Sequence, residues 1–376
     1  MEVNTMQTEI PEDTSRRITS LRFLLAMLVV FIHNQLTSEG FLQGNDIHGA
    51  VKVLNQSAFG AWVEEFISKG LAAAAVPLFF CFSAYLQAKK DDAYPVLLKK
   101  KTRTLFIPFV LWTGIYFFCT SGLKYILSLC MPSLFNKPEQ TIALWTVSDW
   151  IYELLGYKFS GGLQVYPMPN AVQLWFVRDL IILTVCSPLL VRIIKKVPVL
   201  FFCVVSAFLF LSIDLHIVQK QSLFFYITGL YWGMKDIPLF EEIDRIKWFE
   251  IVPLFIISFF MCEFFSADNS TTLWWMVLCC CGLFLKLSRV ISENERLYAY
   301  AKYLAGFSFF LYAIHLPLLF RILQTVWLRF FPMENTFFCL LDYFMVAFLI
   351  IAVGTGLGIL LRKICPPVFR LLNGGR

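Results

Sequence analysis

Charged side chains are scarce in this chain of 376 residues. Only 15% of its residues are Asp, Glu, Lys or Arg, and 58% are hydrophobic, with a mean hydropathy of +0.68. Soluble domains carry about 25% charged residues, so this composition excludes a soluble domain and favours a membrane protein. The formal net charge of +6 is therefore interpreted as a signal of membrane topology, not of nucleic-acid binding.

Histidine is rare, and patterns that bind metals are missing from the sequence. The chain has four histidines and eleven scattered cysteines, with no CxxC pair and no His/Cys cluster at metal-ligand spacing. We therefore expect no metal, and we expect most cysteines to be reduced and buried. No small-residue cleavage site follows the first apolar run, which predicts an uncleaved N-terminus.

Apolar runs of roughly membrane-spanning length recur along the whole chain. They predict an all-α membrane protein, a polytopic bundle of about ten transmembrane helices, although several runs are shorter than the roughly 20 residues that a bilayer requires. The expected spans are 21–36, 70–88, 104–120, 171–191, 198–213, 221–234, 248–266, 271–285, 303–326 and 336–361. The expected organisation is an N-terminal segment 1–20, a transmembrane domain 21–361 and a tail 362–376.

Basic residues are distributed unevenly between the two sides of this ten-span arrangement. The side that carries both termini holds 23 of the 32 lysines and arginines. Cytoplasmic loops of membrane proteins are enriched in Lys and Arg, so both termini are predicted to be cytoplasmic. The expected location is the plasma membrane, which in a bacterium is the inner membrane, with the lipid bilayer as a partner.

The first expected span carries an arginine at its start and a histidine near its end. Arg22 and His33 are eleven residues apart, which on a helix places them within roughly 20° of one face and about 16 Å apart. Charged residues in a span usually face a protein interior or a wet cavity. An arginine can hold a phosphate-bearing donor, and a histidine can take and return a proton. The alternative is that Arg22 snorkels to the headgroups and that His33 is an ordinary buried histidine.

Five stretches, in order, resemble the acyltransferase-three family of membrane acyltransferases. The arginine and histidine of the first span match its R-x10-H pattern, and further matches lie at VPLFFCFSAYL (76–86), KKTRTLFIPFVLW (100–112), QLWFVRDLIIL (173–183) and FSFFLYAIHLPLL (307–319). The resemblance covers about residues 16–361. The chain departs from the family pattern at Ala84, where a glycine is usual, and at Lys100, the first basic residue of the family's RxxR segment.

This resemblance implies transfer of an acyl group, often acetyl and sometimes succinyl, from cytoplasmic acyl-coenzyme A to hydroxyls of cell-envelope glycans or lipid-linked sugars. His33 would be the catalytic histidine, as a base or as an acyl relay. Arg22, Lys100 and Arg103 would contact the phosphates of the donor. For Lys100 and Arg103, simple anchoring at the membrane surface is an equally good interpretation. No nucleic-acid partner is expected.

Two further groups of polar residues are candidates for binding the acceptor sugar. Trp175, Arg178 and Asp179 could contact sugar hydroxyls and a ring face, or they could form an aromatic belt with interhelical pairing. The side chains of adjacent Arg178 and Asp179 should diverge by about 100°, so each is expected to need its own partner. Tyr312 and His315 should share a face of the ninth span. His315 could be a second proton carrier or a polar contact that locks the helix before Pro317.

A transport or polysaccharide-export function is the alternative to an enzyme, because ten spans with buried charges are common in transporters. The sequence has no internal repeat and no matched pair of Gly/Pro-broken helices, which argues against it. Binding of coenzyme A thioesters would separate the two interpretations.

Overall fold

The computed structural model describes residues 10–34, 55–90, 92–130, 142, 145–157, 169, 171–211, 213, 215–238, 240–265 and 270–375. All regular structure within these ranges is helical. The helices are α1 (Glu12–His33), α3 (Ala58–Glu65), α4 (Ala75–Lys90), α5 (Tyr94–Lys101), α6 (Ile107–Phe117), α7 (Leu123–Cys130), α8 (Val147–Leu155), α9 (Trp175–Lys196), α10 (Pro198–Phe210), α11 (Lys220–Met234), α12 (Glu241–Arg245), α13 (Trp248–Phe264), α14 (Ser270–Glu293), α15 (Glu295–Ala305), α16 (Ser308–Ile314), α17 (Phe320–Phe330), α18 (Thr336–Ile364) and α19 (Pro366–Leu372).

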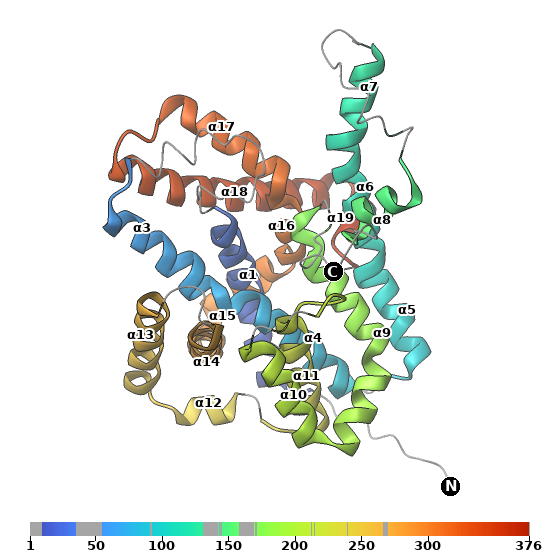
Figure 1. The fold of residues 1–376 in the computed structure, drawn as a ribbon, viewed down its shortest axis with the longest axis vertical. Helices are drawn as coiled ribbons and strands as arrows, with labels where there is room; N and C mark the ends of the chain where they lie inside the picture. Colours follow the sequence, from blue (N-terminus) through green and yellow to red (C-terminus); the bar gives the residue numbers. More distant parts are fainter. Residues whose placement is uncertain are drawn as a thin grey trace.

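Helix α1 lies at the centre of the molecule, enclosed by the other helices (Figure 1). It packs against α4, α14, α15, α16 and α18. It begins well before the expected start at residue 21, directly after Pro11 and with Glu12 and Asp13 in its first turn. Acidic side chains near a helix N-terminus stabilise the backbone N–H groups exposed there, which explains the earlier start. The helix ends at His33, so the candidate histidine lies in its last turn.

Residues 58–69, directly before the second expected span, are helical. Ser57 caps α3 by accepting a hydrogen bond from the Gly60 backbone. A π-helical turn (66–71) and a 3₁₀ turn (72–74) then join α3 to α4, giving one helical run from Ala58 to Lys90. Trp62 stacks on Phe260, and Phe66 packs edge-on against Phe259. These contacts with α13 stabilise a helix that its local sequence did not identify as part of a span.

Within the described ranges, six helical segments are long and apolar enough to cross a membrane, so the chain is a multi-pass membrane protein. They are Ala58–Lys90, Tyr94–Gly122, Val172–Lys196, Thr271–Glu293, Ser308–Phe330 and Thr336–Ile364. Helix α10 is apolar but shorter. Four expected spans, at 21–36, 198–213, 221–234 and 248–266, correspond to α1, α10, α11 and α13, which are not among the six. The count of about ten spans and the cytoplasmic termini stay predictions.

Helices α4 and α11 pack unusually close together because two glycines of α11 face the α4 backbone. A Cβ atom on Gly229 would lie 2.2 Å from the carbonyl oxygen of Cys81. A Cβ atom on Gly233 would lie 2.8 Å from the carbonyl oxygen of Tyr85. Glycines four residues apart allow such an approach between membrane helices, and here they fix α11 beside α4.

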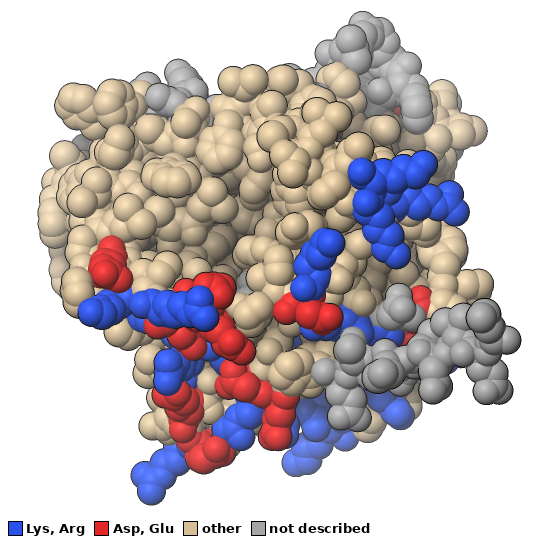
Figure 2. Space-filling model, turned by 90° about the horizontal axis from the view of Figure 1, so that it is seen from below, with Lys and Arg blue, Asp and Glu red and all other residues tan. Residues whose placement is uncertain are grey.

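Large apolar side chains cover much of the outer surface. Phe264, Val199 and Phe249 are 84%, 75% and 69% exposed. Viewed from below Figure 1, most Lys, Arg, Asp and Glu side chains gather in the lower part of the face, a further group of Lys and Arg lies at the right, and a broad area above shows other residues (Figure 2). An apolar belt next to a charged zone is the pattern expected where a bilayer meets water.

The C-terminal segment is built into the bundle. Helix α19 packs against α6, and the Trp112 indole donates a hydrogen bond of 2.9 Å to the Leu372 carbonyl. Asn373 accepts from the Phe310 backbone N–H at 3.1 Å and donates to the Gly306 carbonyl at 2.7 Å. Much of the segment that the sequence places in a tail thus braces the start of α16.

Candidate active site

The last turn of α1 is held by two neighbouring elements, and this fixes the position of His33. Ser68, in the π-helical turn after α3, donates a hydrogen bond of 2.8 Å to the Phe31 carbonyl. The Tyr343 hydroxyl of α18 lies 2.7 Å from the same Ser68 hydroxyl. The side-chain amide of Asn34 donates to the Tyr343 carbonyl. Three elements therefore meet around the backbone that carries His33.

His33 opens into a cavity of about 560 Å³. The walls are mostly apolar and aromatic, with a smaller number of polar side chains, as is usual for small-molecule sites. The lining residues are Val29, Ile32, His33, Glu65, Ser68, Lys69, Ala73, Val76, Pro77, Gln173, Trp175, Phe176, Gln219, Gln221, Phe259, Cys262, Glu263, Leu273, Trp274, Met276, Val277 and Tyr312.

The polar side chains of this cavity come mainly from segments that sequence reasoning did not select. Lys69 and Glu65 form an ion pair of 2.7 Å one helical turn apart. Glu263, at the end of α13, also lines the cavity. Gln221 donates a hydrogen bond of 2.6 Å to the side-chain oxygen of Gln219. An acidic residue inside the apolar run of α13 was the sequence signal that could have identified Glu263.

Trp175 and Tyr312, both expected acceptor-binding residues, do line the cavity. The Tyr312 hydroxyl donates to the Gln173 carbonyl, and the Gln173 amide donates to the carbonyls of Ala313 and Leu316 at 3.1 and 2.8 Å. These bonds tie the start of α9 to the break between α16 and α17.

His315 lies beside His33, although the two are 282 positions apart in the numbered chain. Their ring centroids are 5.3 Å apart, and the planes are tilted by 34°. His315 is 1% exposed and begins the π-helical turn 315–319 between α16 and α17. Its Nδ1 atom lies 2.6 Å from the Tyr312 carbonyl oxygen. The structure thus brings together the two histidines that the sequence placed in separate spans.

The expectation that the side chains of Arg178 and Asp179 diverge is wrong, whereas each does have a partner of its own, as expected. The Arg178 guanidinium folds back to Asp179 Oδ1, with hydrogen bonds of 3.1 and 3.3 Å, because its long side chain can reach its neighbour. Arg178 also donates to the Leu155 carbonyl at 2.7 Å. Asp179 accepts from the Gln219 backbone and from Ser222, each at 2.9 Å. Neither side chain is among the described residues that line the cavity.

In the described structure the buried pair holds residues of the cavity wall, and its expected contact with the acceptor stays a prediction. Asp179 holds Gln219, which is a lining residue, at the start of α11. Arg178 holds the end of α8 and lies over the Tyr157 ring, with its guanidinium carbon 4.9 Å from the centroid.

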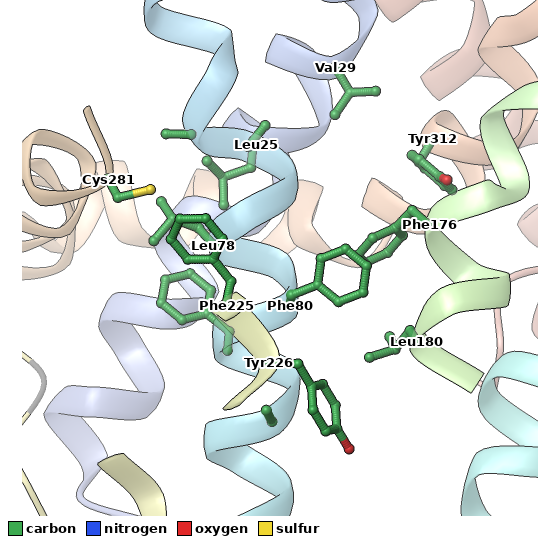
Figure 3. Packing of buried hydrophobic residues seen from close by; sticks show 14 of the residues in the cluster. Leu25, Val29, Leu78, Phe80, Phe176, Leu180, Phe225, Tyr226, Cys281 and Tyr312 are labelled. Atoms are coloured by element: carbon green, nitrogen blue, oxygen red, sulfur yellow. The ribbon is translucent and has the colours of Figure 1, made fainter. Parts of the chain in front are cut away.

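Arg22 lies on the same face of α1 as His33, but an apolar layer separates them. Leu25 and Val29 are 0% and 2% exposed and belong to the main core cluster. Leu25 lies beside Leu78 of α4 in the close view, and Phe80 faces Phe176 of α9 (Figure 3).

The Arg22 side chain is itself partly buried, and the described part of the chain provides no hydrogen-bond acceptor for its guanidinium. A partly buried guanidinium that has no acceptor among the described residues is a group to which an anion can bind.

The two other expected donor-binding residues are exposed. Lys100 forms an ion pair with both carboxylate oxygens of Asp92, at 2.6 and 2.8 Å. Arg103, in the π-helical turn after α5, has no acceptor among the described residues. Neither residue lines the cavity of His33 as described. The described residues include no group of three or more His, Cys, Asp or Glu side chains that could hold a metal ion.

Comparison with known proteins points to one family. The chain matches the acyltransferase domain family over residues 16–363. It is also similar to the succinoglycan biosynthesis protein ExoH of Rhizobium meliloti (strain 1021), with 23% identity over 97% of this chain and 93% of that protein. No solved structure matches the chain significantly. Because the family match extends over almost the whole chain, this protein belongs to the acyltransferase family and is a multi-pass membrane acyltransferase.

Proposed function

We propose that the protein moves an acyl group, most simply acetyl, from acyl-coenzyme A to a hydroxyl of a cell-envelope polysaccharide or its lipid-linked precursor, with His33 as the catalytic base. The observation that carries this proposal is the position of His33 at the wall of a large, mostly apolar cavity inside the helix bundle. The relative whose name places it in the biosynthesis of succinoglycan, a polysaccharide, supports a glycan acceptor.

The chemistry required of His33 is a single proton transfer in each direction. The unprotonated ring nitrogen takes the proton of the acceptor hydroxyl while that oxygen forms a bond to the thioester carbonyl carbon. The carbon–sulfur bond then breaks, and the thiolate leaves with the proton that His33 returns. The products are an O-acyl ester and free coenzyme A, and no metal or redox cofactor takes part.

Arg22 is the proposed contact for the phosphates of the donor. It is partly buried without an acceptor among the described residues, and a guanidinium binds phosphate oxygens in a two-pronged geometry. It lies about 16 Å from His33 along α1, a span that the extended arm of coenzyme A would bridge between nucleotide and thioester. This assignment requires side chains such as Leu25 and Val29 to move aside when the donor enters.

The acceptor sugar is proposed to occupy the side of the cavity lined by α3, α13 and the start of α14. Trp274 offers an aromatic face there, and Glu65, Lys69 and Glu263 offer groups that accept or donate hydrogen bonds to hydroxyls. Polar groups placed among aromatic walls give orientation as well as affinity. This set replaces Arg178 and Asp179 as the proposed acceptor contacts.

The proposed setting is the bacterial inner membrane with both termini in the cytoplasm. The excess of Lys and Arg on the terminal side supports this orientation. The donor would then enter from the cytoplasm by way of Arg22, and the acceptor would meet His33 from the opposite side.

The test is acyl transfer from radiolabelled acetyl-coenzyme A to envelope glycan in membranes of equal protein content. His33→Ala should reduce the rate by about 10²–10⁴-fold, the usual contribution of a general base. His216→Ala is the matched control, because His216 is exposed, and it should leave the rate unchanged. Wild-type rates in the His33 variant would refute the catalytic assignment, and label that enters no glycan would refute the acceptor class.

Donor binding to the purified protein tests the second half of the proposal. Arg22→Ala should weaken acetyl-coenzyme A binding by roughly 10–100-fold, the contribution expected of charged hydrogen bonds. Arg103→Ala should have a smaller effect because the side chain is exposed, and Lys100→Ala the smallest, because Asp92 already pairs with it. Equal binding by the wild type and the Arg22 variant would show that the donor enters elsewhere.

A further inference from the structure

The environment of His315 specifies which of its nitrogens carries the proton. A backbone carbonyl oxygen can only accept a hydrogen bond, so the Nδ1 atom that lies 2.6 Å from the Tyr312 carbonyl must be the donor. In the neutral ring, Nε2 then carries the lone pair. This Nε2 atom is buried and has no hydrogen-bond partner within the described part of the chain. A buried acceptor without a donor is costly, which points to a partner that engages it during function.

His33 is the polar ring placed to become that partner. A hydrogen bond of about 2.9 Å between two ring nitrogens, with roughly 1 Å from each nitrogen to its ring centre, spans about 5 Å between centroids. The observed centroid distance is 5.3 Å. A small rotation of the His33 ring, which borders the cavity, would close this gap, whereas His315 is fixed by its bond to Tyr312.

We propose that His315 is a positioning residue that accepts a hydrogen bond from His33 through Nε2 and so sets the tautomer of the catalytic ring. This inference rests on the proposed function of His33. With one His33 nitrogen donating to His315, the other nitrogen of the neutral ring carries the lone pair, and it is the nitrogen that would take the proton of the acceptor hydroxyl. When His33 takes the hydroxyl proton, its positive charge is shared with a neutral imidazole. His315 thus accepts the hydrogen bond that sets the protonated nitrogen, a role that a carboxylate or a backbone carbonyl commonly has for other catalytic histidines.

A purely structural role for His315 makes a different prediction. In that case only the bond from Nδ1 to the Tyr312 carbonyl matters, because it stabilises the helix break at residues 315–319. The amide group of asparagine can replace Nδ1 but reaches no further, whereas the longer glutamine amide reaches the position of Nε2. His315→Asn and His315→Gln therefore separate the two roles.

The experiment measures kcat and KM for acetyl-coenzyme A in both variants, with thermal unfolding in detergent as the check on folding. If His315 positions His33, His315→Asn should lose at least tenfold in kcat at unchanged KM and unfolding temperature, and His315→Gln should retain several times more of the rate. Wild-type kcat in the folded His315→Asn variant would overturn the proposal. Equal losses in the two variants would overturn it as well.

The double variant His33→Ala/His315→Asn tests whether His315 acts through His33. Because His315 is proposed to act through His33, the second substitution should cause no further loss in the residual rate of His33→Ala. A further tenfold loss would show an independent role and refute the proposal. If His33→Ala itself were fully active, the proposed function would fail. If the His33→Ala variant were inactive and the single His315→Asn variant were fully active, only the inference about His315 would be refuted.

Discussion

The hydroxyl oxygens of Ser68 and Tyr343 lie 2.7 Å apart, and the single proton of Ser68 is already committed to the Phe31 carbonyl. Tyr343 must therefore donate to Ser68, which makes a directed chain from α18 through the π-helical turn to the last turn of α1. The chain ends two residues before His33. Its members are buried, so each lost bond leaves an unsatisfied polar group close to the His33 ring.

The first prediction concerns this chain of hydrogen bonds. Ser68→Ala removes both bonds and should cost about 1–3 kcal/mol, together with a several-fold loss in kcat as the end of α1 loosens. Tyr343→Phe removes one bond and should cause the smaller loss. Thermal unfolding in detergent and the transfer assay would measure the two effects.

Thr228→Val is a suitable control for the hydrogen-bond chain. Thr228 donates only to the Phe224 carbonyl within α11, at 2.8 Å, and it is not a lining residue. The Thr228→Val substitution should leave kcat unchanged. A Ser68→Ala protein with wild-type kcat would show that His33 is positioned without this chain.

The second prediction concerns Arg17, whose guanidinium joins α1, α12 and α14. It forms hydrogen bonds of 2.7 and 2.9 Å to both carboxylate oxygens of Asp244, and it donates to Ser288 and to the Leu285 carbonyl, each at 2.9 Å. Arg17 is 2% exposed. Removing one partner of a buried ion pair typically costs about 3–5 kcal/mol, so Arg17→Ala should markedly lower the unfolding temperature.

Arg245→Ala provides the contrast for Arg17. Arg245 pairs with Glu242, and both side chains are largely exposed, so its loss should change stability by about 0.5 kcal/mol or less. Similar unfolding temperatures for the two alanine variants would mean that the buried network around Arg17 contributes no more than a surface ion pair.

The third prediction concerns the close approach of α4 and α11. Gly229→Ala places a methyl group where only 2.2 Å separates it from the Cys81 carbonyl oxygen, and a backbone atom cannot move aside cheaply. The two helices must separate, so we expect a loss of about 1–3 kcal/mol or more. A drop in yield and unfolding temperature would be the measured outcome.

Gly356→Ala is the matched control within another membrane helix. No heavy atom lies within 4 Å of a Cβ atom at Gly356 of α18, so alanine should be neutral or slightly stabilising there. If Gly229→Ala were equally harmless, it would show that α4 and α11 can separate without a loss of stability.

The sequence predicted what depends on local pattern. The apolar run at 336–361 identified α18, composition identified the membrane character of the chain, and the R-x10-H spacing placed Arg22 and His33 on one face of α1. Composition could not show how far helices continue, because the extension of α3 into α4 depends on aromatic contacts with α13. The count of ten spans stays a prediction for the same reason, since α10, α11 and α13 are short and depend on their neighbours.

Residues of the candidate site could be predicted only where their residue type stood out within the local sequence. His33 did so as a histidine in an apolar run, Trp175 as an aromatic residue near the end of an expected span, and Tyr312 as the residue that shares a helix face with His315. Glu263 and Lys69 were missed because they reach the cavity only through the packing of α13 against the region of α3. Arg17 was counted with the surface charges, since no local pattern reveals that Asp244 folds over it.

The buried layer formed by Leu25 and Val29 has a consequence for membrane permeability. An enzyme whose two substrates come from opposite sides risks becoming a leak for protons and other ions that would discharge the membrane potential. Among the described residues, the buried aliphatic side chains of Leu25 and Val29 lie between Arg22 and His33, and such close packing opposes the passage of water at that level. Opening only around a threaded donor would let acyl groups cross while the electrochemical gradient is preserved.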